Sequence, residues 1–504
     1  MSEEIPNARE KLKKLRKKIG YSQRQMAKAF NVAPGSISLW ENGERKIPGP
    51  VEKLLEIYEK NLYLHDQETI DSICSGRWER VWQGAKLASK SSVNWMKVNL
   101  VSKVMAREKA MLLKQETTEA IYRDLFKHLS DLRGLHMKIG QMFGFMKDDL
   151  PESVKKFVQP YQYSLKPMSP HIIEEVVFKE FNQSPQDIFK VWHSLPFAGG
   201  SIGQVHMAED KSGELLAVKV QYPRIVEALH ADFKNIELLQ SVFNTLFRSA
   251  IDGVFVDEIR ERLLEECDYK VEKKNIVEFQ KVWNGDSVVC IPKVKDQYCS
   301  RYTLATEYVE GEDFHTFLKN STQEEKDKLG ETLFRFHFTS IYKHRIFNAD
   351  PHPGNYIMRD GKVYFIDFGC VARFSKSTID QLRSIFIPLL NRDFEAFKVA
   401  SIESGFVGDE ERFNFKDHYE AMMLTCEPVN SEPYQYRFNH HYVREIFRRM
   451  VLDTPNLPYS NIRKEMVFLQ RLQFGMYSIL ADLNATADWR SIYMNALDLD
   501  ENKI

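Results

Sequence analysis

The chain has 504 residues, of which 43% are hydrophobic and 28% are charged. Such a composition buries enough apolar surface to fold, which excludes a wholly disordered protein, and the length accommodates about three domains of ordinary size. The formal net charge of −1 excludes a global electrostatic field that would attract nucleic acid or acidic lipid.

The cysteines and the N-terminus indicate a reduced, cytoplasmic setting. The six cysteines include no C-x-x-C pair, which disfavours both a zinc site and a disulfide framework. The first residues, MSEEIPNARE, lack the apolar core of a signal peptide, and no apolar run approaches the ~18–20 residues that a membrane-spanning helix needs. We therefore expect a cytoplasmic protein without a spanning helix.

Residues 1–62 are expected to form a small all-α module of short helices. Ser22 followed by Gln25 is typical of a capping box, Gly43 suits a left-handed helix end, and Pro48 precedes the next helix. Residues 1–60 hold 13 Lys and Arg against 8 Glu and no Asp, so this module is modestly basic on an otherwise neutral chain.

The segment YSQRQMAKAFNVAPGSISLWENGERKIP resembles the Cro/repressor type of helix-turn-helix, with Ala27, Val32, Ile37 and Trp40 at the positions that pack its central helices. The resemblance implies that the helix near Pro34–Asn42 enters the DNA major groove and that Gln23 and nearby lysines meet phosphates. Its reading face offers no Arg, Asn or Gln for bidentate base contacts. Two interpretations stay open: DNA binding, and a protein-docking or structural module.

Residues 63–170 are expected to be a helical linker and extension. Within it, residues 88–114 carry apolar side chains near helical spacing with lysines and arginines between them. This pattern is typical either of peripheral contact with a membrane surface or of ordinary core packing.

The segment FNADPHPGNYIMRDGKVYFIDFG carries the strongest chemical signal. Asp350 and Asn355 stand five apart in a Pro-rich loop, and a short apolar strand then ends at Asp367 in the tripeptide D-F-G. Phosphoryl transfer needs oxygen ligands for Mg²⁺ and a carboxylate near the attacking oxygen, and this spacing supplies both. We predict Asn355 and Asp367 as metal ligands and Asp350 as a catalytic carboxylate.

Two further segments complete the predicted site. Lys219 lies in the strand pattern LAVKV, and Glu272 lies in a helical stretch from which it can pair with that lysine and hold it against phosphates. Between two predicted strands, the loop FAGGSIGQVH places backbone N–H groups where they can approach phosphate oxygens. The nucleotide-binding residues expected in this loop are Ala198, Gly199, Gly200, Ser201 and Gly203.

Over roughly residues 120–490 these motifs together resemble the UbiB family of atypical kinases, also called AarF or ADCK-like proteins. The resemblance also covers K-x-G-Q at 138–141, E-x-D at 266–268, D-P-H-P-G-N at 350–355 and the C-terminal YSILADLNATADWR. It implies ATP and Mg²⁺ as cofactors, ATPase or kinase activity, and a role in isoprenoid-quinone or lipid metabolism.

The resemblance further implies that the K-x-G-Q helix covers the nucleotide site. Lys138 would then face Glu266 and Asp268, with Gln141 near the nucleotide, and the closed cleft would favour a small-molecule or lipid-like acceptor over a peptide. The chain departs from the family where it reads Ala198-Gly199-Gly200-Ser201, since the family's loop is alanine-rich, and this puts nucleotide preference in doubt.

We expect an α+β, two-lobed protein-kinase-like fold with a helical N-terminal extension and a small all-α helix-turn-helix domain. The expected boundaries are 1–62 for the module, 63–170 for the extension, 171–310 for the N-lobe and 311–504 for the C-lobe. The expected function is that of an ATP-Mg²⁺-dependent atypical kinase or ATPase. The alternative is a nucleotide-sensing, non-catalytic transcriptional regulator or a protein-docking pseudokinase. The phosphoryl acceptor, the operator and the oligomeric state are left open.

Overall fold

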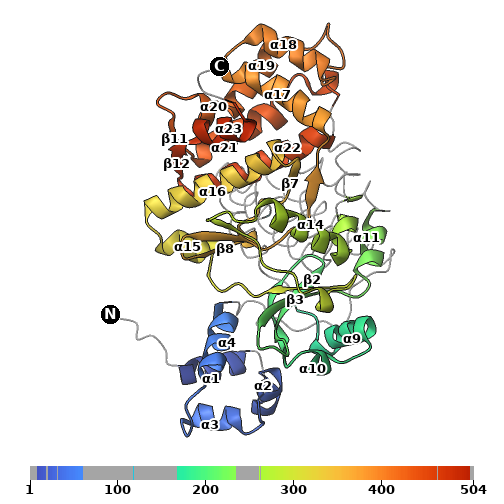
Figure 1. Ribbon diagram of the computed structural model, residues 1–504, viewed down its shortest axis with the longest axis vertical. Coiled ribbons are helices and arrows are strands. Elements are labelled where there is room, and N and C mark those ends of the chain that lie inside the picture. Colours follow the sequence, from blue (N-terminus) through green and yellow to red (C-terminus); the bar gives the residue numbers. More distant parts are fainter. Residues whose placement is uncertain are drawn as a thin grey trace, which may run out of the picture. The chain divides into compact units, whose positions relative to one another are not determined.

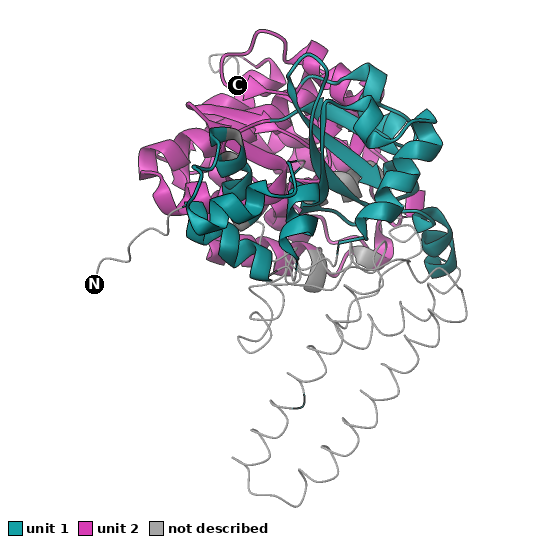
Figure 2. Ribbon diagram, turned by 90° about the horizontal axis from the view of Figure 1, so that it is seen from below, with its two compact units in different colours: residues 1–246, 263–273, 293–308 teal, residues 247–262, 274–292, 309–504 magenta. Residues whose placement is uncertain are grey.

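The computed structural model in Figure 1 describes residues 8–18, 21–30, 32–60, 117, 167–233, 260–261, 263–461 and 464–499. The predicted K-x-G-Q helix with Lys138 and Gln141, and the basic stretch 88–114, lie outside these residues. The chain divides into two compact units, coloured in Figure 2. Unit 1 comprises residues 1–246, 263–273 and 293–308, and unit 2 comprises residues 247–262, 274–292 and 309–504. Each unit is described on its own below.

Unit 1 begins with four short helices. They are α1 (Ala8–Lys18), α2 (Gln23–Ala29), α3 (Ser36–Asn42) and α4 (Gly49–Lys60). The capping box predicted from Ser22 and Gln25 is present at the start of α2, and Gly43 ends α3 with a left-handed φ of 79°. These local signals were predictable because each cap satisfies backbone groups of its own helix end.

The core of this helical module consists of apolar side chains from all four helices. Ala27, Ile37 and Trp40 are buried, and Val32 packs against them half-buried, as the helix-turn-helix pattern predicts. Burying a continuous apolar face between short helices supplies the stability that helices of this length lack in isolation.

The remainder of unit 1 is built on a four-stranded antiparallel sheet with the strand order β1-β2-β3-β5. Its elements are α9 (Pro170–Phe181), α10 (Pro185–Ile188), β1 (Val191–Gly199), β2 (Gly203–Glu209), β3 (Leu215–Gln221), α11 (Ile225–Phe233), η2 (Asp296–Tyr298) and β5 (Thr303–Glu307). The helix α14 (Tyr269–Val282) starts in unit 1 and continues into unit 2.

The helical module packs directly on this sheet. Its apolar core is continuous with Leu195 and Phe197 of β1 and with Met207 of β2. The hydroxyl of Tyr58, which is buried at the end of α4, donates a hydrogen bond to the Leu195 carbonyl oxygen at 2.9 Å. The module and the sheet therefore share one core.

Unit 2 combines short strands with helices. Its strands are β4 (Val289–Cys290), β6 (Glu312–Asp313), β7 (Ile346–Asn348), β8 (Tyr356–Arg359), β9 (Lys362–Phe365), β10 (Val371–Arg373), β11 (Gln435–Arg437) and β12 (Thr486–Asp488). Its further helices are α15 (Phe314–Asn320), α16 (Gln323–Tyr342), η3 (Pro353–Asn355), α17 (Lys376–Leu390), α18 (Phe394–Glu403), α19 (Phe415–Thr425), α20 (Glu427–Asn430), α21 (His440–Phe447), the π-helical turn Arg448–Leu452, η5 (Leu457–Tyr459), α22 (Lys464–Leu483) and α23 (Trp489–Leu497).

The core of unit 2 lies around the long helix α16. At Gly330 this helix approaches its neighbours so closely that an added Cβ would lie 2.7 Å from the Ala485 Cβ and 3.3 Å from the Trp489 ring. The buried Trp489 ring contacts Phe334 of α16 with ring centroids 5.1 Å apart. This packing fixes the helix that directly precedes strand β7.

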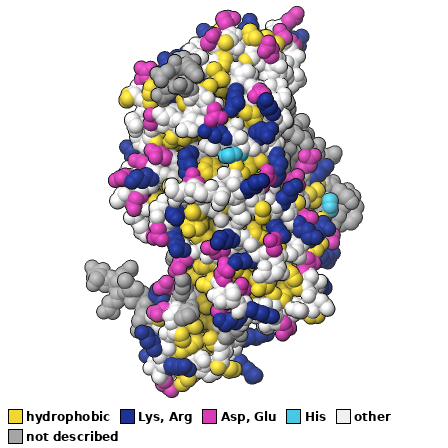
Figure 3. All heavy atoms as spheres, in the orientation of Figure 1, with side chains coloured by type: hydrophobic (Ala, Val, Ile, Leu, Met, Phe, Trp, Pro, Cys, Tyr) yellow, Lys and Arg dark blue, Asp and Glu magenta, His cyan; other side chains and the backbone are white. Residues whose placement is uncertain are grey.

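The fold is a mixed helix and sheet structure with a helical N-terminal segment, as predicted. On the face drawn in Figure 3, acidic and basic side chains are interspersed, in keeping with the near-zero net charge. No described helix is long and apolar enough to cross a membrane.

Candidate nucleotide site

Lys219 and Glu272 form an ion pair within unit 1. Lys219 lies on the central strand β3, and its Nζ lies 3.0 Å from Glu272 Oε1 and 2.9 Å from Oε2. The Glu272 side chain is only 3% exposed and that of Lys219 is 20% exposed. Two short contacts to a buried carboxylate fix the ammonium group in one place, which suits a lysine that has to meet phosphate oxygens.

Tyr269 supports both the lysine and the glycine-containing loop. Lys219 Nζ lies 5.2 Å from the centroid of the Tyr269 ring, within reach of a cation–π interaction. The Tyr269 hydroxyl is buried and has no hydrogen-bond partner among the described residues. Burial raises the pKa of this phenol well above its ordinary value, so it stays neutral beside the lysine.

The loop between β1 and β2 is closed by a short turn. The Gly200 N–H donates to the Gly203 carbonyl oxygen at 2.7 Å, and Ser201 lies between them in the turn. Ala198 and Gly199 are the last residues of β1, with Gly199 opposite Gln204. A Cβ at Gly203 would lie 2.4 Å from the Tyr269 hydroxyl and 2.6 Å from the Val220 carbonyl oxygen, so only glycine fits there.

In unit 2, one hairpin places Asn355 next to the D-F-G segment. Strand β8 begins directly after Asn355, and β9 ends two residues before Asp367, with Tyr356 opposite Phe365. The Ile366 N–H donates to the Asn355 carbonyl oxygen at 3.1 Å. The turn of this hairpin, Asp360-Gly361, has positive φ at both residues, which matches the right-handed twist of the strands.

A second strand pair brings Asp350 to the same place. Strands β7 and β10 pair antiparallel with Asn348 opposite Val371, and the Ala349 N–H donates to the Cys370 carbonyl oxygen at 2.8 Å. The Asn355 side-chain amide donates to the Asp350 carbonyl oxygen at 2.9 Å. Asp350, Asn355 and Asp367 therefore come from loops that hydrogen bonds tie together.

Asn348 links the two loops and escaped the sequence analysis. Its amide nitrogen donates to the Asp367 carbonyl oxygen at 2.7 Å, and its amide oxygen accepts from the Asp350 N–H at 3.2 Å. A single asparagine at the end of a three-residue strand has no spacing signature, so only the fold reveals this role.

The oxygen donors in unit 2 fit a divalent cation of the Mg²⁺ type. Mg²⁺ prefers one or two carboxylates together with substrate phosphates over a cage made only of protein ligands. Asp350, Asn355 and Asp367 offer two carboxylates and one amide. Among the described residues there is no group of three or more His, Cys, Asp and Glu placed to hold a metal ion.

The E-x-D residues lie just before α14 in unit 1. Glu266 is buried, and the Asp268 carboxylate accepts a hydrogen bond from the Lys270 N–H at 3.0 Å and lies 3.9 Å from Arg301 Nε. Between them, burial raises the pKa of the Cys267 thiol to about 12, which makes it a poor nucleophile. The expected partner, Lys138, lies outside the described residues, so its contact with these carboxylates stays a prediction.

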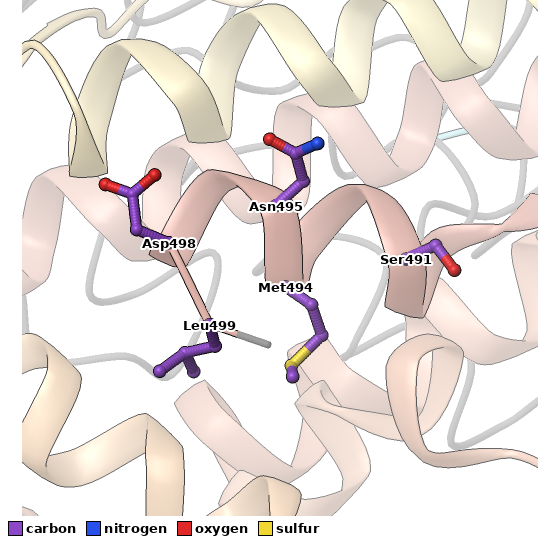
Figure 4. A pocket seen from close by; sticks show the side chains of 5 residues that line it. All are labelled: Ser491, Met494, Asn495, Asp498 and Leu499. Carbon is purple, nitrogen blue, oxygen red and sulfur yellow. The ribbon is translucent and has the colours of Figure 1, made fainter. Parts of the chain in front are cut away.

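Other hollows of the surface do not involve these residues. The pocket in Figure 4 has a volume of about 350 Å³ and is lined by Ser491, Met494, Asn495, Asp498 and Leu499, from α23 and the residues directly after it. A neighbouring cavity is lined in part by Trp283, Asp286 and Arg335. Neither contains a predicted site residue.

Two family profiles match the chain. The ABC1 atypical kinase-like domain matches residues 161–401, which include Lys219, Glu272, Asp350, Asn355 and Asp367. A helix-turn-helix profile matches residues 12–57. The two profiles together cover the module and most of the predicted site.

Curated relatives are similar over the kinase-like region. "Atypical kinase COQ8, mitochondrial" of Saccharomyces cerevisiae is 27% identical over 311 residues, which cover 60% of this chain and 61% of that protein. "Probable protein kinase UbiB" of Histophilus somni is 26% identical over 320 residues, covering 60% of this chain and 58% of that protein. The matches thus span less than two thirds of the length of these relatives.

A solved structure supports the fold. The complex of Rv3197 with erythromycin from Mycobacterium tuberculosis matches with a TM-score of 0.55 at 24% identity, covering 78% of this chain and 98% of that one. At this level of identity, the match establishes a common fold and nothing further.

Proposed function

We propose that the chain is an ATP- and Mg²⁺-dependent kinase or ATPase, because the ABC1 atypical kinase-like profile matches residues 161–401 and the curated relatives include the COQ8 and UbiB kinases. The observation that carries the proposal is the Lys219–Glu272 ion pair in unit 1, together with the hydrogen-bonded Asp350, Asn355 and Asp367 loops in unit 2. These are the parts that phosphoryl transfer requires.

In this proposal each residue has one task. Lys219, held by Glu272, binds the α- and β-phosphates, and the backbone of residues 198–203 approaches the phosphate oxygens. Asn355 and Asp367 supply oxygen ligands to Mg²⁺, which when bound neutralises the charge of the phosphates. Asp350 orients the attacking oxygen and accepts its proton. Lys138 and Gln141, which lie outside the described residues, keep the role that the resemblance implies for them, that of covering the nucleotide.

We propose a small-molecule or lipid-like acceptor in isoprenoid-quinone or lipid metabolism, reached by a cytoplasmic protein that touches the membrane only at its periphery. The proposal rests on the similarity to the COQ8 and UbiB kinases. The rival proposal is a non-catalytic regulator in which nucleotide binding switches the module.

The proposal is tested with Asp367→Asn. A neutral amide replaces a hard anionic ligand, so Mg²⁺ should no longer strengthen nucleotide binding, and hydrolysis should fall by at least about tenfold. Calorimetry of ATP binding with and without Mg²⁺ measures the first effect, and phosphate release measures the second.

Asp360→Asn is the matched control, because it replaces the same carboxylate by the same amide at the exposed turn of the same hairpin. Equal Mg²⁺ dependence in Asp367→Asn and in the parent would reject the assignment. Binding without measurable hydrolysis in the parent, even with lipid vesicles and phenolic quinone precursors present, would favour the non-catalytic regulator.

We further propose that the helix-turn-helix module binds DNA through α3. The residues that face the module core from α3 are Ile37, Trp40 and Glu41, whereas Leu39 and Asn42 are exposed and Ser38 is half-exposed. Arg45 and Lys46, three and four residues after the end of α3, are also exposed and can meet phosphates. An exposed helix face bordered by basic residues is what groove binding requires.

Ser38→Glu tests this proposal without removing the module. A carboxylate on the reading face should repel the phosphate backbone and weaken the binding of a mixed DNA library at low salt by about tenfold or more. Ser384→Glu, at an exposed site of α17, is the control for net charge. Equal anisotropy titrations for both variants would instead favour a protein-docking module.

A further inference from the structure

Asn275 is a buried polar residue of α14 whose side chain has two fixed partners in unit 2. Its amide oxygen accepts a hydrogen bond from Arg373 Nη2 at 2.8 Å, and its amide nitrogen donates to the Phe368 carbonyl oxygen at 2.9 Å. Since a guanidinium can only donate and a carbonyl can only accept, the two partners fix the orientation of the amide. Arg373 is itself held by Glu278, one turn further along α14.

The carbonyl that Asn275 holds belongs to the D-F-G segment. The preceding carbonyl, that of Asp367, accepts from Asn348, so buried asparagine amides hold two consecutive carbonyls of this segment. The Asp367 carboxylate in turn accepts from the Gly369 N–H at 3.0 Å. With both neighbouring peptide groups fixed, the backbone at Phe368 has little freedom to rotate.

Helix α14 also holds the Phe368 side chain. The Phe279 ring, four residues after Asn275 and therefore on the same helix face, contacts the Phe368 ring with centroids 4.8 Å apart. Helix α14 therefore contacts both the ring and the carbonyl oxygen of Phe368. Glu272, the partner of Lys219, precedes Asn275 by three residues on this same continuous helix.

We propose that Asn275 is a positioning residue that presents the Asp367 carboxylate in the orientation needed for metal binding. The inference rests on the proposed function, which assigns Mg²⁺ to Asp367. A ligand whose backbone is held before the metal arrives binds that metal with less loss of conformational freedom.

The test is the Mg²⁺ dependence of nucleotide binding in Asn275→Asp. The new carboxylate retains its attraction to Arg373 but presents an oxygen, instead of an N–H, to the Phe368 carbonyl. We expect the apparent Mg²⁺ affinity, measured by calorimetry with a non-hydrolysable ATP analogue, to fall by about tenfold because a buried carbonyl loses its donor. Binding of the analogue without metal should not change.

Gln280→Glu is the matched control on the same helix. Its side-chain nitrogen donates to a backbone carbonyl outside the D-F-G segment, that of Pro292, at 2.6 Å. The same amide-to-carboxylate change there should leave the Mg²⁺ titration as in the parent. Amide hydrogen exchange of residues 366–371 in the metal-free protein should accelerate in Asn275→Asp and not in Gln280→Glu.

Arg373→Gln is the second variant, in case Asn275→Asp fails to fold. The Arg373 side chain is half-exposed, so its loss is tolerated by the core, yet it frees the Asn275 amide to turn. A smaller loss of Mg²⁺ affinity, about threefold, is expected, since the donor to Phe368 is weakened and not removed.

Two results would overturn the proposal while the proposed function stands. The first is that the folded Asn275→Asp and Arg373→Gln variants bind Mg²⁺ as tightly as the parent, whereas Asp367→Asn no longer does. The other is an equal loss of metal-free nucleotide binding, which would indicate general damage to the unit. Parental behaviour of Asp367→Asn itself would overturn both the positioning role and the proposed function.

Discussion

His206, on β2, shows how burial fixes the protonation state of a single residue. Its Nδ1 lies 2.9 Å from the His193 carbonyl oxygen, which can only accept, so Nδ1 carries the proton; Nε2 then accepts from the Gln204 amide at 3.0 Å. The Trp192 ring stacks on it at 4.8 Å. Burial lowers the pKa of His206 to about 4.

This pKa predicts a loss of stability in mild acid. The unfolded chain takes up a proton at its ordinary pKa of about 6.5, whereas the folded chain resists until about 4, so protons favour unfolding between these values. From pH 7 to pH 5 the contribution to the free energy of unfolding should fall by about 2 kcal/mol. Denaturant unfolding of the parent and of His206→Gln at both pH values measures it.

His206→Gln removes the titrating group, so its stability should depend less on pH than that of the parent by this amount. His337 of α16, whose pKa burial lowers to about 3, is present in both proteins and cancels in the comparison. Equal pH dependence of the two proteins would contradict the assignment.

The sequence predicted those residues of the candidate site that belong to a recognisable motif, and it missed those that lie outside one. Asp350, Asn355 and Asp367 stand at the spacing from which a metal site was predicted, and Lys219 lies in a recognisable strand pattern. The D-G turn of the hairpin is a local signal. Asn275 and Asn348 act through backbone carbonyls of a distant segment, 93 and 19 residues away, and no spacing rule contains them. Their roles depend on the pairing of β7 with β10 and on the position of α14.

At the scale of elements, α1, α2 and α3 are held by one buried carboxylate. Glu41 of α3 accepts hydrogen bonds from Arg16 of α1 at 2.6 and 2.9 Å and from Gln23 of α2 at 2.7 Å. Burial raises the pKa of Glu41, but the hydrogen bonds from Arg16 and Gln23 outweigh it, so the pKa is lowered overall. The amide of Gln23, expected at DNA phosphates, donates to Glu41 in this structure.

Replacing Arg16 alone should destabilise the module more than replacing both Arg16 and Glu41. Arg16→Met leaves a buried carboxylate without its cation and should destabilise the module by about 3 kcal/mol, whereas Arg16→Met combined with Glu41→Leu should recover most of the loss. Hydrogen exchange of the amides in residues 12–58 reports the stability of the module directly. If the double variant is no more stable than Arg16→Met, the ion pair is not the source of the effect.

The sequence predicted the helices of this module better than the strands of unit 2. A helix start depends on residues a few positions apart, as at Ser22 and Gln25. The three-residue strands β11 and β12 instead pair residues that are far apart in the sequence, such as Gln435 and Asp488. Each strand is too short to show a pattern of its own. In unit 2 the sequence analysis identified the strand that ends before Asp367, and the structure adds β7, β10, β11 and β12, whose partners lie far away in the sequence.

At the scale of the whole chain, the module is not an independent domain of unit 1. Its core continues into Leu195, Phe197 and Met207, and Tyr58 is buried against the sheet. Phe197 directly precedes the loop 198–203 that the proposed function assigns to phosphates. Binding at that loop therefore acts on a strand that the helix-turn-helix module also touches.

The contact of Tyr58 with Leu195 joins residues that are 137 positions apart in the sequence. A cut in the chain between them divides the polypeptide and leaves this contact in place. A protease site inserted between residues 61 and 66 should yield two fragments that co-elute in gel filtration and separate only in denaturant, because the shared apolar core outlasts the broken peptide bond. In Tyr58→Ala, which opens the core at its centre, the cut fragments should elute apart. A nicked parent that falls apart under native conditions would show that covalent linkage, and not packing, keeps the helical module on the sheet of unit 1.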